Sequence, residues 1–223
     1  YQRVWCMTFR DADCQPLSEY WINEMSKGFE EQKQIVIGVG IYEKEKGFLN
    51  KIIRYDTVQI AINSLGYGKA KLAYMGVGRN LAYHQDVYYL NDGFKSHYHV
   101  ESGDDDLFVN QASNISNTQV IFNSKSMTIS KPKKEFKSWV YQKRRHHTTN
   151  FKYKKKHKIL LGMQYLSALA FYFLLIFSFF SINYVKIGLI LFTVRYLLII
   201  AINYKAFKIL SLIHISEPTR PYS

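Results

Sequence analysis

One long apolar stretch toward the carboxyl-terminal end limits what this chain can fold into. Residues 159–185 form a run of 27 residues without a charged side chain. A helix of this length crosses the roughly 30 Å hydrocarbon core of a bilayer with some tilt. The run therefore predicts a chain that is anchored in a membrane.

A second apolar run follows almost directly. Residues 187–202 include one charge, Arg195, and alone this run of 16 residues is marginal as a span. Lys205 and Lys208 come back to the side on which the first run begins, so we expect two transmembrane helices over residues 159–205. Their outer turn is expected near residues 183–186.

The segment before these runs is strongly basic. Residues 131–158 contain twelve Lys or Arg and one acid, Glu135. Cytoplasmic flanks of membrane helices carry such an excess of cations. We therefore predict a multi-pass protein of the cytoplasmic (inner) membrane, with residues 131–158 at the interface and the preceding domain facing the cytoplasm.

The charge and cysteine content agree with this setting. The chain has 30 basic and 17 acidic side chains, a formal net charge of +13, which favours an anionic partner or a membrane surface. Cys6 and Cys14 are too few for a disulfide framework and lack metal-ligand spacing. A reduced, cytosolic environment for the domain is the simpler interpretation.

Both ends of the chain look unnatural. It begins with Tyr-Gln-Arg-Val-Trp and no Met, which predicts a fragment. Residues 210–220 (LSLIHISEPTR) resemble the translation of a transposase adaptor used in DNA sequencing, although a natural polar tail is the alternative. Residues 206–223 are therefore expected to be a largely artefactual tail.

Residues 1–130 alternate β-prone runs with helical patterns, which predicts an α/β domain. Strands are expected over residues 4–9, 34–42 and 71–77, with shorter β-prone runs at 118–122 and 126–129. Helices are expected to start near residues 16–19, to extend over residues 48–65, and to start again at residues 106–112.

Three adjacent carboxylates, on Asp104, Asp105 and Asp106, lie where the last of these helices begins. The helix dipole favours their charged forms, whereas their mutual repulsion raises at least one pKa. That conflict suits a general base or a metal site. An acidic helix N-terminus without chemistry is the alternative.

Two further groups of residues are candidates for ligand binding. Asp11 and Asp13 follow the first predicted strand, where two carboxylates can share one hard cation with a pyrophosphate; a solvated turn is the commoner explanation. Gly76 and Gly78 allow a ligand to approach the backbone closely, and Arg79 beside them could contact an anion or be a structural partner. The third glycine of a dinucleotide-binding motif is missing.

Aromatic residues lie among the cations of the basic segment. Trp139 and Tyr141 would suit stacking on nucleic-acid bases. The membrane interpretation explains more of the segment, because the apolar runs follow it directly. We therefore expect a membrane partner and no nucleic-acid partner.

Three motifs follow one another in a particular order: Asp11-Ala12-Asp13, then Gly103-Asp104-Asp105-Asp106, then Gln142-Lys143-Arg144-Arg145-His146. The separations are about 92 residues (105 − 13) and 37 residues (142 − 105), and membrane helices come last. This set resembles the C-terminal two thirds of a membrane-bound family 2 glycosyltransferase, of the kind related to cellulose and hyaluronan synthases. The resemblance covers roughly residues 1–205.

The resemblance implies a GT-A fold, a mixed α/β sheet that binds a nucleotide-sugar donor with Mg²⁺ or Mn²⁺. Residues 1–130 would be the C-terminal part of this catalytic domain, incomplete at its N-terminus and followed by the interfacial segment and the transmembrane hairpin. The implied reaction is an inverting transfer of the sugar to a lipid-linked or polysaccharide acceptor. Because the strand–helix units that bind the nucleotide base are missing, the fragment alone is expected to bind donor poorly and to be inactive.

The resemblance also implies roles for individual residues. Asp105 matches the general base, and Asp13, together with Asp11, matches the ligands of the metal and the diphosphate. The positions that match substrate-binding residues are Gly76, Gly78, Asp104, Gln142, Arg144, Arg145 and His146. Processive members have a Trp where this chain has His146, which argues against processive polymer synthesis.

Two other functions fit parts of the sequence. A basic, membrane-tethered protein could bind polyanions through residues 131–158 without catalysis. A glycoside hydrolase could use paired acids, but it would not explain the basic QxxR segment or the membrane hairpin.

Overall fold

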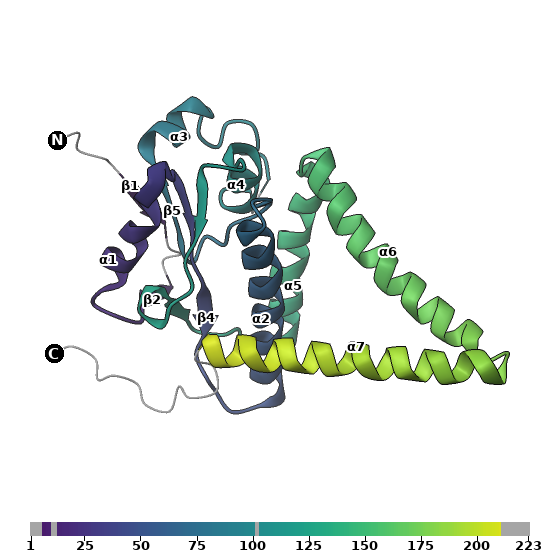
Figure 1. Ribbon diagram of the computed structural model, residues 1–223. Helices are drawn as coiled ribbons and strands as arrows, with labels where there is room; N and C mark the ends of the chain where they lie inside the picture. The colour runs from purple at the N-terminus through teal and green to yellow at the C-terminus, as the bar shows by residue number, and fades with distance from the viewer. Residues whose placement is uncertain (1–5, 10–12, 101–102, 211–223) are drawn as a thin grey trace.

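The computed structural model describes residues 6–9, 13–100 and 103–210. They form a mixed α/β domain followed by two long apolar helices that leave the domain and return to it (Figure 1). Asp11 and residues 211–220 lie outside the described residues, so the first half of the Asp-x-Asp motif and most of the adaptor-like segment have no structural account.

Within the described residues, seven short strands form two small sheets. The first sheet has the order β1-β5-β3-β6 and the second the order β2-β7-β4. The pairs β3–β6 and β4–β7 are parallel and the other pairs are antiparallel. The strands are β1 (Cys6–Phe9), β2 (Cys14–Pro16), β3 (Ile35–Ile37), β4 (Gly40–Tyr42), β5 (Leu81–His84), β6 (Thr118–Val120) and β7 (Thr128–Ser130).

Helices cover both faces of the first sheet. Val36 of β3 packs with Trp21 and Met25, whereas Ile35 and Ile37 pack on the other face, with Phe108 among their neighbours. Such a strand, buried on both faces, is a continuous apolar run. The helical segments are α1 (Trp21–Ser26), η1 (Lys27–Gln32), α2 (Phe48–Lys69), α3 (Gln85–Leu90), α4 (Asp106–Ala112), η2 (Ser124–Ser126), α5 (Phe136–His147), η3 (Thr148–Lys152), α6 (Lys155–Ser178) and α7 (Ile182–Ile209).

The expected strand over residues 71–77 is wrong. This segment is an extended loop, and the strand, β5, begins only after the glycines, at Leu81. The reason is that two side chains bind the carbonyl groups of this loop. Asn110 of α4 donates from Nδ2 to the Tyr74 oxygen at 2.7 Å, and Ser113, which follows α4, donates from Oγ to the Ala73 oxygen at 2.8 Å. A β-prone sequence therefore packs against a helix instead of joining a sheet.

The expected strand over residues 34–42 is two strands that belong to different sheets. The chain changes sheet after β3, at Gly38, where a side chain would meet Asn80 at 2.5 Å. The Gly38 N–H donates to the Asn80 carbonyl at 2.9 Å, and the Thr128 N–H donates to the Val39 carbonyl at 3.1 Å. Both sheets thus meet at one glycine.

Asn80 joins the two sheets and α1. It is fully buried. Its Nδ2 group donates to the carbonyls of Val39 at 2.9 Å and Ser126 at 2.7 Å, and its Oδ1 accepts from Trp21 Nε1 at 3.1 Å. One side chain therefore satisfies three buried polar groups from three parts of the chain.

The two C-terminal helices could cross a membrane by length and composition. Helices α6 and α7 meet at their outer ends and diverge toward the domain (Figure 1). Near their middle, the Arg195 guanidinium lies over the Phe171 ring at 4.5 Å, and the Tyr172 and Tyr196 hydroxyls are 3.1 Å apart. The turn lies between Ser178 and Ile182, a few residues before its expected place at 183–186.

Both ends of the hairpin are attached to the domain. Helix α7 continues to Ile209, into the segment expected to be a tail, and Leu210 is buried against the domain. Asn203 is hydrogen bonded to Gln59 of α2, and the Phe207 ring stacks on Tyr55 with centroids 6.3 Å apart. The end of α7 therefore lies against the domain from which α6 starts, as a hairpin requires.

We expect Asn80→Ala to destabilise the domain by about 3 kcal/mol, because it leaves the Trp21 indole N–H and the Ser126 carbonyl without partners and removes one of the two bonds to the Val39 carbonyl. Thermal unfolding of the purified protein in detergent measures this change. Asn23→Ala, an exposed position on α1, is the matched control and should change little. Equal melting temperatures for the two variants would contradict the role of Asn80.

Candidate active site

Asp105 is the N-cap residue of α4, and both oxygens of its carboxyl group accept backbone hydrogen bonds. Oδ1 accepts from the Asp106 N–H at 2.6 Å, and Oδ2 accepts from the Gly78 N–H at 2.6 Å. The first bond is to the first residue of the helix, one position before the N–H groups that an Asp cap usually binds. The second bond brings together two predicted site residues that are 27 positions apart in the sequence.

Burial, followed by the negative charge of Asp106, raises the pKa of Asp105 to about 7. The two N–H groups that bind the carboxylate act in the opposite direction and offset only part of this effect. A carboxyl group with a pKa near the working pH is well suited to accept a proton from a substrate hydroxyl.

A cavity of about 760 Å³ opens beside Asp105. Four predicted site residues line it, and they come from three parts of the chain: Gly76, Asp105, Gln142 and His146. Ligand sites of small molecules commonly have this size and a few polar groups that converge on an apolar wall.

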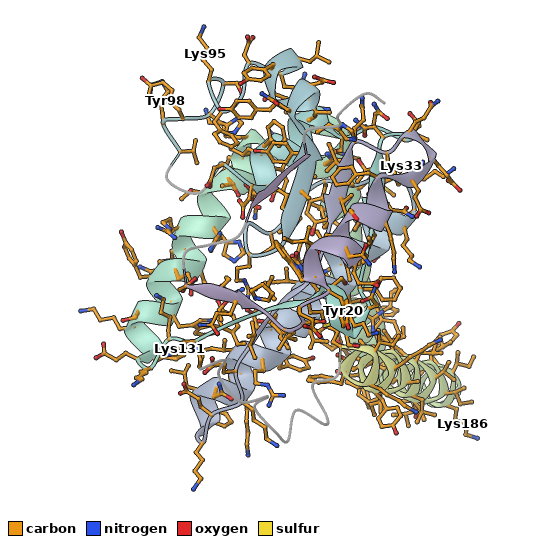
Figure 2. The ribbon with its side chains drawn as sticks, turned by 90° about the vertical axis from the view of Figure 1, so that its left-hand side faces the viewer. Tyr20, Lys33, Lys95, Tyr98, Lys131 and Lys186 are labelled. Carbon is orange, nitrogen blue, oxygen red and sulfur yellow. The ribbon has the colours of Figure 1, made fainter. Side chains whose placement is uncertain are left out.

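Helix α5 forms one wall of the cavity, and none of its residues is buried. Two attachments hold it in place. Lys143 forms an ion pair with Asp56 of α2, and the segment after α5 is bound to α4 as described below. Long side chains of this basic region project away from the domain, beginning near Lys131 (Figure 2).

His146 lies at the mouth of the cavity. Partial desolvation and the positive charges of Arg145, Lys143 and Arg79 lower the pKa of His146, although the residue is exposed, and Asp104 opposes them. The imidazole is therefore neutral near pH 7 and can accept as well as donate a hydrogen bond. Charges from Asp104, Arg79 and α5 all act on His146. The acidic turn, the loop that contains Gly76 and Gly78, and α5 therefore lie close together.

Asp13 is exposed next to the first residue of β2. In the sheet register, Cys14 is opposite Ser130, and Ser130 is opposite Tyr42, which lines the cavity. Adjacent strands are about 4.8 Å apart, so the start of β2 lies roughly 10 Å from the Tyr42 backbone. The start of β2 is therefore two strands away from Tyr42, and Asp13 itself does not line the cavity.

The described residues contain no group of three or more His, Cys, Asp or Glu that could hold a metal ion. An all-protein metal site is therefore not present in this part of the chain. An exposed carboxylate such as that of Asp13 does fit Mg²⁺ or Mn²⁺ in another way, because these ions often bind through one or two carboxylates together with substrate phosphates.

Three further predicted residues do not line the cavity, and neither do Gly78 and Asp13. Asp104 is exposed on the acidic turn, and Arg144 is exposed on α5. Arg145 faces a separate hollow of about 450 Å³ on the other side of α5, together with Lys133, Lys137 and Tyr141. Gln142 lines both spaces and lies between them.

Asp106 is a functional residue to which sequence reasoning gave no separate role. It is buried, and its Oδ2 accepts from the hydroxyls of Thr149 at 2.6 Å and Tyr153 at 2.9 Å. One turn later, Asn110 Oδ1 accepts from the Lys154 N–H at 2.8 Å. Polar residues on the buried face of a short helix were the available signal, and these bonds fasten the segment between α5 and α6 to α4.

Arg79 also lines the cavity. Its guanidinium lies over the Tyr42 ring at 4.3 Å, and Nη1 is buried without a hydrogen-bond partner among the described residues. Sequence reasoning left open whether Arg79 binds an anion or a structural partner. The cation–π contact fixes the side chain and leaves one buried donor unused.

Comparison with models of known protein families finds no match, and no curated protein matches the chain either. The assignment to the membrane-bound family 2 glycosyltransferases therefore stays a prediction from the motifs.

The raised pKa of Asp105 predicts a pH-dependent effect of Asp105→Asn. The contribution of Asp105 to stability is lost as pH rises from about 4 through 7, because the folded state must then hold a charged carboxylate that is largely removed from water. Asn carries no charge, so the stability of the variant relative to wild type should increase by roughly 2 kcal/mol between pH 4 and pH 8. Unfolding curves at the two pH values measure this difference. Asp86→Asn, an exposed control, should show no such trend, and a pH-independent difference for Asp105→Asn would contradict the assignment.

Proposed function

We propose that the chain is part of an inverting, metal-dependent glycosyltransferase of the membrane-bound family 2. It would transfer a sugar from a nucleotide-sugar donor to a lipid-linked or polysaccharide acceptor at the cytoplasmic face of the membrane. The observation that carries the proposal is the carboxyl group of Asp105, which has a pKa of about 7 and is held at the wall of a substrate-sized cavity.

In this reaction, Asp105 accepts the proton of the acceptor hydroxyl. The hydroxyl oxygen forms a bond to the anomeric carbon while the bond from that carbon to the diphosphate breaks, and the electron pair leaves with the nucleotide diphosphate. The Gly78 N–H keeps the carboxylate oriented during this step. Attack from the side opposite the leaving group inverts the anomeric centre.

Asp13, together with Asp11, would hold the Mg²⁺ or Mn²⁺ ion. When bound, the ion offsets the negative charge that develops on the departing diphosphate. Arg79 is a cation at the wall of the same cavity, and its rigid planar guanidinium suits phosphate or other oxygen-rich groups.

The resemblance to family 2 and the position of α5 support a binding role for the QxxR segment. Gln142 lies at the cavity wall, and neutral His146 at its mouth can bond to sugar hydroxyls. Arg144 and Arg145 face away from the cavity, so a contact of either with substrate requires α5 to rotate or a substrate that extends around it. His146 offers a smaller stacking surface than the Trp of processive relatives, which favours the addition of few sugars.

We expect Asp105→Asn to reduce sugar transfer by at least about a hundredfold in the full-length protein, because the proton acceptor is lost. Incorporation of labelled sugar from nucleotide-sugar donors measures the effect. The exposed control Glu19→Gln should retain activity, and both variants should remain in the membrane fraction. Unchanged transfer by Asp105→Asn would contradict the base assignment. Polyanion binding without transfer by the wild type would favour the non-catalytic alternative.

Removal of divalent cations should abolish transfer and leave membrane association unchanged. Mg²⁺ or Mn²⁺ should restore the activity, and Asp13→Asn should require roughly tenfold more metal for the same rate because one carboxylate ligand is missing. Titration of the metal after chelation measures this shift. Full activity in the presence of excess chelator would contradict the metal requirement.

A further inference from the structure

The cavity beside Asp105 is partly walled by a membrane helix. Lys158, Leu161, Gly162 and Tyr165 line it, and all lie in the first turns of α6. Their spacing places them on one face of that helix. The space that contains the candidate base therefore reaches the helix that is apolar enough to cross the bilayer.

The lining of this cavity changes along its length. Asp105 and Arg79, whose buried Nη1 has no hydrogen-bond partner among the described residues, lie on the domain side together with apolar residues such as Met75. On α6, Lys158 in the first turns is followed by Leu161 and the largely exposed Tyr165 ring. A ligand that fits both ends is an amphiphile with a polar head and an apolar chain.

Gly162 leaves the α6 wall open. A Cβ atom at this position would meet no atom within 4 Å, so the space in front of the glycine is empty. Gly inside a helix is less stable than Ala by about 1 kcal/mol, and nothing in the local packing requires it here. Close approach of a ligand to the helix is a use for such a residue.

Polar contacts hold α6 against α2 at this place. Gln164 Nε2 donates to Asn63 Oδ1 at 3.1 Å, and its Oε1 accepts from the Tyr67 hydroxyl at 3.3 Å. The aromatic ring of Phe151, which is 82% exposed, also lines the cavity. Exposed aromatic rings near the end of a membrane helix are typical of the lipid head-group region.

We infer that the acceptor is borne by a membrane lipid, which reaches Asp105 along α6 with its chain against Leu161, Gly162 and Tyr165. This inference rests on the proposed function and narrows its acceptor to one of the two classes. The lipid head group provides the hydroxyl oxygen that bonds to the anomeric carbon. Its proton goes to Asp105, and the nucleotide diphosphate leaves with the electron pair.

The test is photolabelling, which needs no turnover. The chain is placed in phosphatidylethanolamine–phosphatidylglycerol vesicles that contain a glycosyl diacylglycerol with a diazirine in one acyl chain. Wild type should be labelled on the peptide that contains residues 161–165 of α6. Gly162→Leu should reduce this labelling roughly tenfold, and Gly162→Ala should have a smaller effect, because the larger side chain fills the open wall.

Gly66→Leu is the matched control. Gly66 is also a helical glycine at which an added Cβ atom would meet no atom within 4 Å, but it does not line the cavity. Leu is a better helix former than Gly, so neither Gly66→Leu nor Gly162→Leu should impair folding. At Gly162, in the apolar helix α6, Leu also favours insertion into a bilayer. The control should therefore be labelled like wild type.

Two results would overturn the inference. One is equal labelling of wild type and Gly162→Leu at this peptide. The other is displacement of the probe by the free sugar of its head group, which would favour a soluble glycan acceptor. In the full-length protein, labelled product should partition into chloroform–methanol and decrease with Gly162→Leu. Correct labelling without transfer would contradict the proposed glycosyltransferase and leave the lipid site in place.

Discussion

The buried amide of Asn80 holds this domain together. It binds the carbonyls at the start of β4 and before β7, it accepts from the Trp21 indole, and its own backbone carbonyl binds Gly38 where the chain changes sheet. Two positions earlier, the Gly78 N–H binds Asp105. The position of the candidate base thus depends on the same short loop that joins the two sheets, so local packing and site geometry are coupled.

In the acidic turn, opposing effects act on the charge of Asp105. Capping and the helix dipole favour charge on Asp105, whereas burial and the adjacent Asp106 oppose it, and burial is the larger effect. Asp106 is itself buried, with a pKa raised to about 6, and two hydroxyl groups stabilise its charge. Both carboxylates line the cavity, and Asp106 in addition attaches the segment that leads to α6.

Local signals predicted several elements well. The helix over Asp106–Ala112 has the predicted bounds because an Asp cap precedes an apolar run, and the start of α2 at Phe48 agrees with its apolar spacing. The expected strand over residues 71–77 failed because Asn110 and Ser113, far along the chain, bind its carbonyls. Tertiary hydrogen bonds of this kind leave no trace in local periodicity.

In the candidate site, too, some features could be predicted from the sequence and others depend on tertiary contacts. The motifs and the family resemblance grouped Asp105 with Gly76, Gln142 and His146, and these four residues do line one cavity. The outward position of Arg145 depends on the rotation of α5 about its axis, which the Lys143–Asp56 ion pair helps to fix. This ion pair joins residues 87 positions apart (143 − 56), so a sequence motif does not show it. The role of Asp106 likewise depends on partners that fold against it from after α5.

The attachment of the hairpin at both of its ends has a mechanical consequence. Helix α6 begins at the segment that Asp106 and Asn110 bind, and α7 ends against α2 at Tyr55 and Gln59. A domain on a single tether can swivel and change its height above the lipid surface. Two anchorages remove that freedom. In a bilayer that the two helices could cross, its thickness would set the tilt of the splayed pair and, through it, the angle of the domain to the lipid surface.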